Sequence, residues 1–233
     1  MAKLKVSILK DKVIFNQQDA KHLKALRVKL YSQVVCCDEN GQYFLVQIDS
    51  LNPITGKVIK RLEDKTCPDP YNITCFLGVI KKQYFELAVN QLSQLNILKI
   101  VPVYFEYSQK NYQLDLKRIQ KICCESKKQC ERKQELIIKA PISFNEMVVQ
   151  LANYDFNFLA YEKQTQSEWD KVAFKNQNSI SFMIGPEGGI SDKEIKVLQN
   201  KCIFLKLTNT ILKAETAAIY LASTLIERFY NAK

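Results

Sequence analysis

The pattern of short apolar runs changes at residues 63–72, EDKTCPDPYN, where two prolines and several polar residues interrupt it. After this break, apolar runs of strand length alternate with stretches of helical spacing. Such alternation predicts an α/β domain with a mostly parallel sheet, because parallel neighbours need a crossover connection between them. The expected strands are ITCFLGVI (73–80), KIVPVYF (99–105), ELIIKA (135–140), FNFLAYE (156–162), ISFMIG (180–185) and IFLKL (203–207).

The residues before the break follow a different pattern. Runs rich in β-branched and aromatic residues, QVVCCD, YFLVQI and GKVIKRL, are separated by turn signals such as DENGQ. One helical patch, residues 18–27, precedes them. We therefore expect a small β-rich module in residues 1–70, in the form of a barrel, followed by the α/β domain in residues 71–233.

The composition excludes several classes of protein. No apolar run approaches the ~20 residues that cross a bilayer, and the N-terminus lacks the apolar core and cleavage site of a signal peptide. We expect a cytoplasmic protein without a membrane partner. The eight cysteines show no C-x-x-C spacing and His22 is the lone histidine, which argues against a metal site. Reduced cysteines used as small apolar residues are the simpler interpretation.

The net charge of +10, from 34 basic and 24 acidic residues, is shared by both expected parts of the chain. A basic field favours a polyanion such as nucleic acid, although solubility alone could explain it. The helix expected at residues 113–133 is the most basic segment. Its charges could form a solvated face or contact phosphates, and the sequence leaves both interpretations open.

Three of the six glycines lie in SFMIGPEGGISDKEI, residues 181–195. The GPEGG loop follows an expected strand and precedes a helix whose start is marked by a capping box, Ser191 with Glu194. Ligands bind beyond the carboxyl ends of parallel strands. The loop contains no basic residue and matches neither G-x-G-x-x-G nor the P-loop, so it suits a ligand that is not strongly anionic. A plain turn that needs glycine for its shape is the alternative.

A second segment, LTNTILKAETAA at residues 207–218, also follows a short strand and opens the last helix. Together, GPEGG and ILKAETA resemble the S-adenosylmethionine site of the SPOUT methyltransferases, and within that superfamily the bacterial 16S ribosomal RNA uracil-N3 methyltransferase family. Weaker matches cover HLKALRVK (22–29), CCESKKQCERKQELIIKAPISF (123–144) and FLAYE (158–162).

The resemblance implies a fold that periodicity does not reveal. It implies a C-terminal SPOUT domain with a deep trefoil knot, which is rare among proteins. It also implies that residues 1–70 form a PUA-like RNA-binding domain and that residues 71–233 form the methyltransferase domain. Members of the family resemble one another in being homodimers with the site near the dimer interface.

The activity implied by the resemblance is methyl transfer from S-adenosylmethionine to N3 of a specific uridine, with 16S rRNA or the small ribosomal subunit as substrate. Uracil N3 carries a proton, so a base or a group that stabilises the resulting anion is needed. Lys213 is the expected charged group, and Glu215 is an acid–base candidate that could instead cap the final helix.

The expected cofactor-binding residues come from three segments of the chain. They are Leu159, Tyr161, Gly185, Pro186, Glu187, Gly188, Gly189, Leu207, Thr208, Ile211, Leu212, Ala214, Thr216 and Ala217. The expected RNA-binding residues lie in the weaker matches and are Arg27, Lys127, Lys128 and Arg132.

The sequence departs from the family pattern at several positions. Lys213 stands where the family has arginine, which keeps the charge but loses the two-pronged fork. The remaining departures are Thr208 in place of a glycine, Gln91 and Gln94 within NQLSQLNI, and Tyr107 in place of an arginine. Two other functions stay open: a SPOUT methyltransferase acting on another RNA or on another atom such as a ribose hydroxyl, and a catalytically silent RNA-binding protein.

Overall fold

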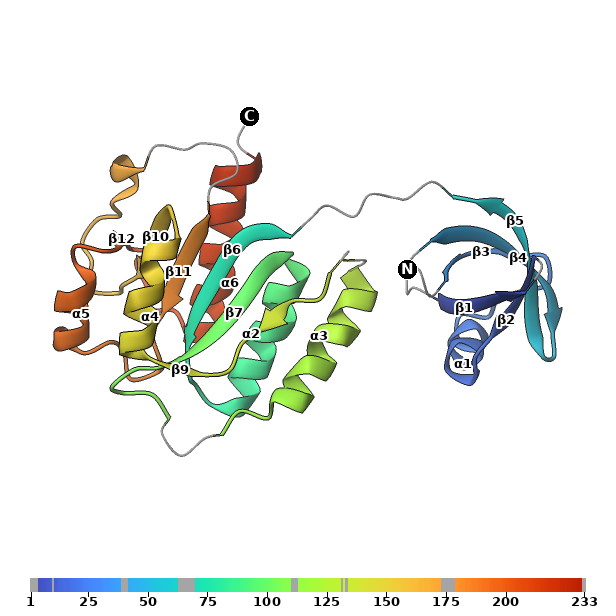
Figure 1. Cartoon of the computed structure of the whole chain (residues 1–233), viewed down its shortest axis with the longest axis horizontal. Coiled ribbons are helices and arrows are strands. Elements are labelled where there is room, and N and C mark those ends of the chain that lie inside the picture. The colour runs from blue at the N-terminus through green and yellow to red at the C-terminus, as the bar shows by residue number, and fades with distance from the viewer. Residues whose placement is uncertain are drawn as a thin grey trace. The chain divides into compact units, whose positions relative to one another are not determined.

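In the computed structural model the chain divides into two units, Met1–Pro68 and Asp69–Lys233 (Figure 1). The sequence pattern had placed this division between residues 70 and 71. The structure describes residues 4–9, 11–38, 42–62, 70–109, 113–130, 132, 134–172 and 179–231.

The first unit is a barrel of five strands closed in the order β1-β2-β5-β4-β3. Its elements are β1 (Leu4–Leu9), β2 (Lys12–Phe15), α1 (Gln17–Ala25), β3 (Gln33–Cys37), β4 (Tyr43–Leu51) and β5 (Ile54–Arg61). All strand pairs are antiparallel except β1 with β3, which is parallel. Val13, Leu23, Val46 and Ile48 are fully buried at its centre. The runs before the break thus form the expected β-rich module.

The second unit is built on a seven-stranded sheet in the order β12-β10-β11-β6-β7-β8, with β9 also paired to β7. The strands are β6 (Tyr71–Gly78), β7 (Ile97–Tyr104), β8 (Ile137–Ile138), β9 (Ile142–Ser143), β10 (Phe156–Ala160), β11 (Ile180–Ile184) and β12 (Ile203–Leu205). Every pair in this sheet is parallel. The prediction of an α/β domain with a mostly parallel sheet is confirmed.

Helices cover both faces of this sheet (Figure 1). They are α2 (Lys82–Gln94), α3 (Leu116–Cys130), α4 (Phe144–Gln150), α5 (Asp192–Leu198) and α6 (Ala214–Ile226), with short turns η1 (Leu151–Asn153), η2 (Trp169–Lys171) and η3 (Glu227–Asn231). Side chains of β6 alternate between two cores, because successive residues of a strand point to opposite faces. Leu77 packs in the core with α2, α3 and α6, whereas Phe76 packs in the core with α4 and α5.

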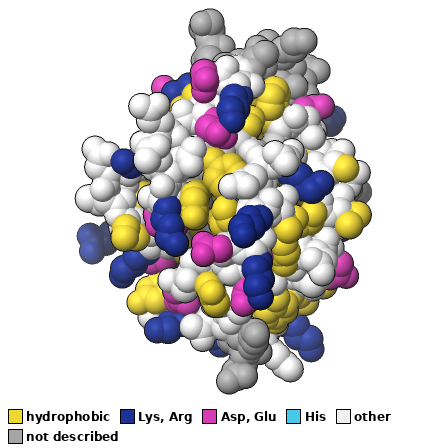
Figure 2. All heavy atoms as spheres, turned by 90° about the vertical axis from the view of Figure 1, so that its left-hand side faces the viewer, with side chains coloured by type: hydrophobic (Ala, Val, Ile, Leu, Met, Phe, Trp, Pro, Cys, Tyr) yellow, Lys and Arg dark blue, Asp and Glu magenta, His cyan; other side chains and the backbone are white. Residues whose placement is uncertain are grey.

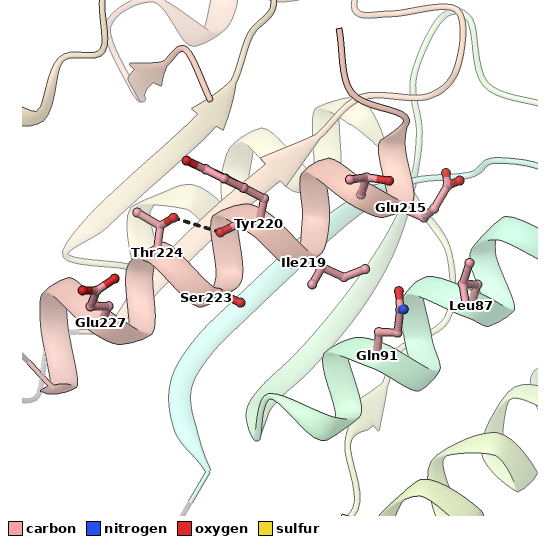
Figure 3. A pocket seen from close by; sticks show the side chains of 9 residues that line it. Leu87, Gln91, Glu215, Ile219, Tyr220, Ser223, Thr224 and Glu227 are labelled. Atoms are coloured by element: carbon pink, nitrogen blue, oxygen red, sulfur yellow. Dashed lines mark hydrogen bonds between the residues drawn. The ribbon is translucent and has the colours of Figure 1, made fainter. Parts of the chain in front are cut away.

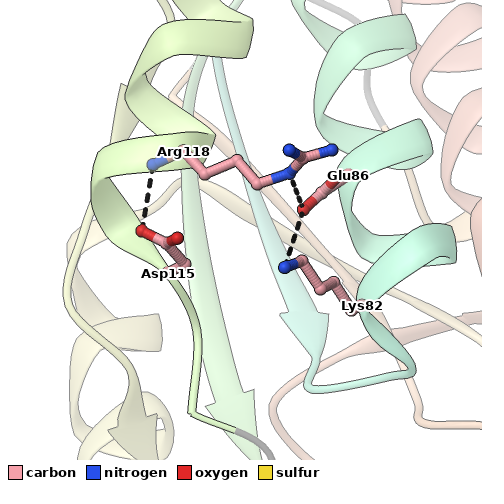
Figure 4. Close-up of polar contacts among 4 residues, drawn as sticks. All are labelled: Lys82, Glu86, Asp115 and Arg118. Atoms are coloured by element: carbon pink, nitrogen blue, oxygen red, sulfur yellow. Dashed lines mark hydrogen bonds and ion pairs between the residues drawn. The ribbon is translucent and has the colours of Figure 1, made fainter.

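The basic helix α3 is tied to α2 by an ion pair (Figure 4). The Arg118 Nε atom donates to Glu86 Oε1 over 2.6 Å, and the Lys82 ammonium lies 4.0 Å from the same oxygen. Because more than half of the Arg118 side chain is exposed, the pair contributes about 0–1 kcal/mol. The main attachment is apolar, through the buried Ile119 and Cys123 of α3. None of the helices in the described ranges is long and apolar enough to cross a membrane.

Two of the helices begin with a capping box, and these boxes differ in their surroundings. At α5, Ser191 and Glu194 form the box predicted from the sequence. Glu194 is only 7% exposed, and its Oε1 atom also accepts a hydrogen bond of 2.8 Å from the backbone N–H of Glu106. At α4, Ser143 and Glu146 form a box at an exposed position. The α5 box therefore also fixes the turn that follows β7.

The buried capping box gives a test of the fold. Glu194→Ala leaves the N–H groups of Ser191 and Glu106 without their acceptors, so it should lower the free energy of unfolding by about 1–3 kcal/mol. Urea denaturation followed by circular dichroism measures this. Glu146→Ala is the matched control, since it removes a box that makes only local contacts, and its effect should be clearly smaller. Equal losses in the two variants would contradict the role given to the Glu106 contact.

Candidate functional site

Three of the segments singled out in the sequence leave the sheet side by side. In the register of the strands, Leu159 of β10 lies opposite Met183 of β11 and Phe204 of β12. Because all three strands are parallel, the chain after each of them emerges at the same edge of the sheet. This edge is where ligands bind in open parallel sheets. The structure therefore brings the segments beginning at residues 161, 185 and 206 together.

The first segment contributes mainly backbone. Leu159 is fully buried in the core with α4 and α5, so its side chain is not available to a ligand. Tyr161 follows, and its N–H donates to the carbonyl of Leu205 over 3.0 Å. Its ring packs edge-on against Phe204, with 5.7 Å between the ring centroids. Leu159 and Tyr161 therefore form the part of the site that lies nearest the sheet.

The GPEGG loop is a tight turn pressed against β6. Gly189 has a φ of 79°, which disfavours other residues, and its N–H donates to the Pro186 carbonyl over 2.9 Å. A Cβ atom on Gly78, at the end of β6, would lie 2.6 Å from the backbone nitrogen of Pro186. Gly78 is thus required for the loop to approach β6, and its only sequence signal was a glycine inside the strand expected at residues 73–80.

Glu187 ties the loop to its two neighbours. Its Oε1 atom accepts a hydrogen bond of 3.4 Å from the N–H of Lys81, and its Oε2 atom accepts one of 3.4 Å from the side-chain amide of Gln109. Lys81 is the N-cap of α2 and makes no side-chain capping bond. The carboxylate therefore satisfies a free N–H and complements the positive end of the helix dipole. This gives a structural role to the one acidic residue of the loop.

β12 lies between β10 and the loop at residues 161–171. On one side it pairs with β10, and on the other the Ser167 hydroxyl accepts from the N–H of Lys206 over 3.0 Å and donates to the carbonyl of Lys206 over 2.8 Å. Glu168 adds a second pair of contacts to Phe204, through its own N–H and through its Oε2 atom. These bonds set the point at which the segment beginning at Leu207 leaves the sheet.

The Glu168 carboxylate is ionised when it makes these contacts. Burial raises the pKa of Glu168, but hydrogen bonds from Lys171 and from the N–H of Phe204 outweigh this effect. The pKa therefore lies below its usual value, and the acceptor keeps its charge at neutral pH.

The third segment, residues 206–217, carries both expected catalytic residues. Lys213 is exposed and is the N-cap of α6, with its ammonium 5.4 Å from the centroid of the Tyr84 ring. Glu215 lies in the first turn of α6 and is 7% exposed. Of the expected cofactor residues here, Leu207, Thr208, Leu212 and Ala214 are partly buried, Ala217 is buried, and Ile211 and Thr216 are exposed.

Glu215 faces a groove between α2 and α6 (Figure 3). The groove is lined by Leu87, Gln91, Glu215, Thr216, Ile219, Tyr220, Ser223, Thr224 and Glu227. Tyr84, Leu87 and Gln91 lie on one face of α2, because they are three and four residues apart. Lys213 therefore lies beside the start of this face, and Glu215 lies further along it. Gln91, one of the departures from the family pattern, lines the groove.

The expected RNA-binding residues lie in different environments. Arg132 is 3% exposed, and its guanidinium donates to the carbonyls of Ser93, over 2.9 Å, and Ile97, over 2.7 Å. Its expected contact with RNA is therefore corrected: this side chain anchors the end of α3 to the α2–β7 connection. Lys127 is partly buried, Arg27 is exposed in the first unit, and the side chain of Lys128 lies outside the described part of the structure.

Charge is mixed on one side of the molecule, the side on which α5 lies. Figure 2 views that side and shows Lys and Arg side chains next to hydrophobic and acidic ones. The visible part of this face therefore carries no patch of a single sign. The exposed basic residues Lys117, Arg118 and Lys121 lie instead on α3.

Metal and thiol chemistry find no support in the described residues. Within them, no three His, Cys, Asp or Glu side chains are grouped as a metal site would require. The cysteines described are free, and most are buried. Burial raises the pKa of Cys202 to about 12, which keeps this thiol protonated and unreactive.

Comparisons with known proteins agree with this geometry. Residues 67–226 match the family model described as RNA methyltransferase domain. The ribosomal RNA small subunit methyltransferase E of Mesomycoplasma hyopneumoniae is 29% identical, over 88% of this chain and 90% of that protein. The protein of the same name from Rickettsia conorii is 26% identical, over 83% and 80%.

Solved structures share the fold. A ribosomal RNA small subunit methyltransferase E from Neisseria gonorrhoeae, bound to S-adenosyl methionine, superposes with a TM-score of 0.75 at 19% identity, over the whole of both chains. A putative methyltransferase from Legionella pneumophila, in complex with the same cofactor, gives 0.71 at 19% identity, over 97% and 98%.

The contacts around β12 give a test that needs no ligand. Ser167→Ala removes the acceptor of the Lys206 N–H, so that amide should exchange its hydrogen at least about tenfold faster, as expected for a lost bond worth about 1.5 kcal/mol. Hydrogen exchange followed by NMR measures the rate. Ser167→Thr is the control, because it keeps the hydroxyl and should restore most of the protection. Unchanged exchange in Ser167→Ala would show that the Ser167 hydroxyl does not hold the chain that follows β12.

Proposed function

The chain belongs to the RNA methyltransferase domain family, and from this premise we propose that it methylates N3 of a uridine in 16S rRNA of the small ribosomal subunit, using S-adenosylmethionine. The observation that carries the proposal is the meeting of GPEGG and ILKAETA at one edge of a parallel sheet. The names of the relatives from Mesomycoplasma and Rickettsia support the small-subunit substrate.

The residues at the sheet edge fit S-adenosylmethionine. The cofactor is not strongly anionic, and the GPEGG loop offers backbone groups without a basic side chain. The expected contacts are Gly185–Gly189 and, nearer the sheet, Leu159 and Tyr161. From the third segment they are Leu207, Thr208, Ile211, Leu212, Ala214, Thr216 and Ala217. Leu207 and Leu212 are partly buried against the core and offer an apolar wall. When bound, the cofactor supplies an electrophilic methyl group on its sulfonium sulfur, and the protein supplies position and electrostatics.

Lys213 is the residue to which we assign the stabilisation of the reacting base. Uracil N3 must lose its proton before it can accept a methyl group, which leaves negative charge on the ring. A nearby ammonium lowers the cost of that charge, as fixed cations do for other anionic transition states. The Tyr84 ring, 5.4 Å from the Lys213 ammonium, helps to hold the side chain in place through a cation–π contact.

Glu215 is the second residue proposed for the chemistry. Its place in the first turn of α6 also suits the positive end of the helix dipole, so a structural contribution accompanies any proton transfer. Its carboxylate faces the α2–α6 groove, so the uracil ring would have to enter this groove to exchange a proton with it.

A homodimer would cover the α2–α6 groove. Leu87 and Tyr220 are 44% and 46% exposed on its two sides, so a second copy packed here would bury apolar surface of both helices. A second copy placed here would add residues to the region of Glu215. This agrees with the site near a dimer interface that the family resemblance implies.

Two features of the fold complete the proposal. β12 is enclosed by β10 and the loop at residues 161–171, and α6 then returns to pack on α2, β6 and β11; this supports a trefoil knot in the C-terminal segment. The closed five-stranded barrel with α1 supports a PUA-like RNA-binding domain. Arg27 is exposed there, and Lys127 and Lys128 belong to the basic helix of the second unit.

Nucleoside analysis of 16S rRNA tests the reaction. Deletion of the gene should remove 3-methyluridine from 16S rRNA, and the restored gene should return it. Unchanged 3-methyluridine would reject this target and favour a SPOUT methyltransferase with another substrate atom. Calorimetry with S-adenosylmethionine separates the remaining alternative, because a silent RNA-binding protein would show no binding.

Lys213→Ala should lower kcat by about 10²- to 10³-fold, as when a single stabilising donor is removed, while the affinity for S-adenosylmethionine changes little. Methyl transfer to small ribosomal subunits and calorimetry measure the two quantities. Lys213→Arg keeps the charge and should retain most of the activity. Lys193→Ala, at an exposed position of α5, is the neutral control. A change confined to cofactor affinity would show that Lys213 binds rather than stabilises the transition state.

A further inference from the structure

The turn that follows β7 presents an aromatic ring beside the GPEGG loop. Tyr107 is 53% exposed, so its ring is accessible to a ligand at this position. A Cβ atom on Gly188 would lie only 2.9 Å from the Cβ atom of Tyr107, so Gly188 lies directly beside the base of the Tyr107 side chain. β7 is parallel to β6, and β6 is parallel to β11, so this turn leaves the sheet at the edge that carries the candidate site.

The position of the Tyr107 ring is set by a rigid turn. The N–H of Phe105 donates to the Ser108 hydroxyl over 2.9 Å, and the N–H of Ser108 donates back to the Phe105 carbonyl over 3.1 Å. Phe105 and Ser108 are both buried. The N–H of Glu106 is held by the Glu194 carboxylate of α5. These bonds fix the turn on both sides of Tyr107. Within residues 105–108, the exposed side chains are those of Glu106 and Tyr107.

The groups around the ring suit a nucleobase. Gln109, two residues on, has its amide within 3.4 Å of Glu187, and its own N–H is bonded to the Val79 carbonyl. An amide offers both donors and an acceptor, which can pair with the edge of a pyrimidine. Lys81 is exposed at the start of α2, where a phosphate could be reached. A flat ring, an amide and a cation are the elements with which proteins hold unpaired bases of RNA.

We propose that Tyr107 is the platform on which the acceptor base stacks when it leaves the RNA helix, with Gln109 at its polar edge. The inference rests on the proposed function, because a base must be taken out of its stack before chemistry can take place on it. Tyr107 is also a departure from the family pattern, in which an arginine stands here. A guanidinium and a phenol ring both offer a flat face to a base, so stacking can survive this change whereas charge does not.

Two substitutions separate stacking from support of the loop. Tyr107→Leu keeps the Cβ atom that contacts Gly188 but removes the flat ring, and Tyr107→Phe keeps the ring. Small ribosomal subunits isolated from the deletion strain are the substrate. The KM of Tyr107→Leu for these subunits should rise roughly 5- to 150-fold, as expected for one lost base–aromatic stack. Tyr107→Phe should stay within about twofold of the wild type on the same scale.

The affinity for S-adenosylmethionine, measured by calorimetry, should be unchanged in both variants. Val197→Ala, at an exposed apolar position of α5, is the control for surface substitution and should leave KM unchanged. Circular dichroism melts confirm that each variant is folded. If Tyr107→Leu does not fold, Tyr107→Gln replaces it and is expected to raise KM in the same way.

Three results would overturn the inference. A normal KM in Tyr107→Leu would show that the ring does not contact the substrate. If Tyr107→Leu lost affinity for S-adenosylmethionine by as large a factor as its KM rose, Tyr107 would only support the loop at Gly188. A wild-type protein that binds S-adenosylmethionine but transfers no methyl group to small subunits would overturn the proposed function as well, which distinguishes the two failures.

Discussion

The parallel register of β12, β10, β11 and β6 is the constraint on which the candidate site depends. Parallel pairing places the carboxyl ends of these strands at one edge, so loops that are far apart in the chain meet there. The register is firmly set because β11 is buried along its whole length, from Ile180 to Ile184. A slip of one residue would exchange Phe182 and Met183 between the two cores, which differ in shape and composition.

Side-chain oxygens that accept hydrogen bonds from backbone N–H groups hold the loops at this edge in place. Glu187 reaches the start of α2, Glu194 reaches the turn after β7, and Ser167 reaches the chain after β12. In each case the acceptor belongs to a different loop from the donor. Loops that carry few apolar side chains cannot be held by a core of their own, so these polar contacts replace it. Such a contact, from Glu187 to the start of α2, explains why the GPEGG loop carries an acidic residue.

Periodicity along the chain was sufficient to predict what depends on local sequence. It predicted the parallel α/β unit, the β-rich module and the capping box at Ser191, because strand alternation, turn residues and N-caps act over a few residues. It did not predict β1 and β2, or that only Ile137 and Ile138 of the run at 135–140 form a strand. Periodicity also did not predict the burial of Arg132 or the hydrogen bonds of Glu187. Both join residues 35 to 106 positions apart, and sequence patterns carry no information about such pairs.

Two of the departures from the family pattern, Tyr107 and Lys213, have exposed side chains at the candidate site, whereas the glycines of the site are fixed by backbone geometry. A Cβ atom on Gly78 would lie 2.6 Å from the backbone nitrogen of Pro186, one on Gly185 would lie 2.6 Å from the buried Ile190 side chain, and Gly189 has a φ of 79°. Tyr107 and Lys213 instead present exposed side chains, of which the Lys213 ammonium contacts the Tyr84 ring. An exposed residue can be replaced if the new side chain keeps the property that a ligand would use, such as a flat face or a positive charge. A backbone contact at 2.6 Å leaves no such freedom, so substitution is more easily tolerated at the exposed positions of the site than at its glycines.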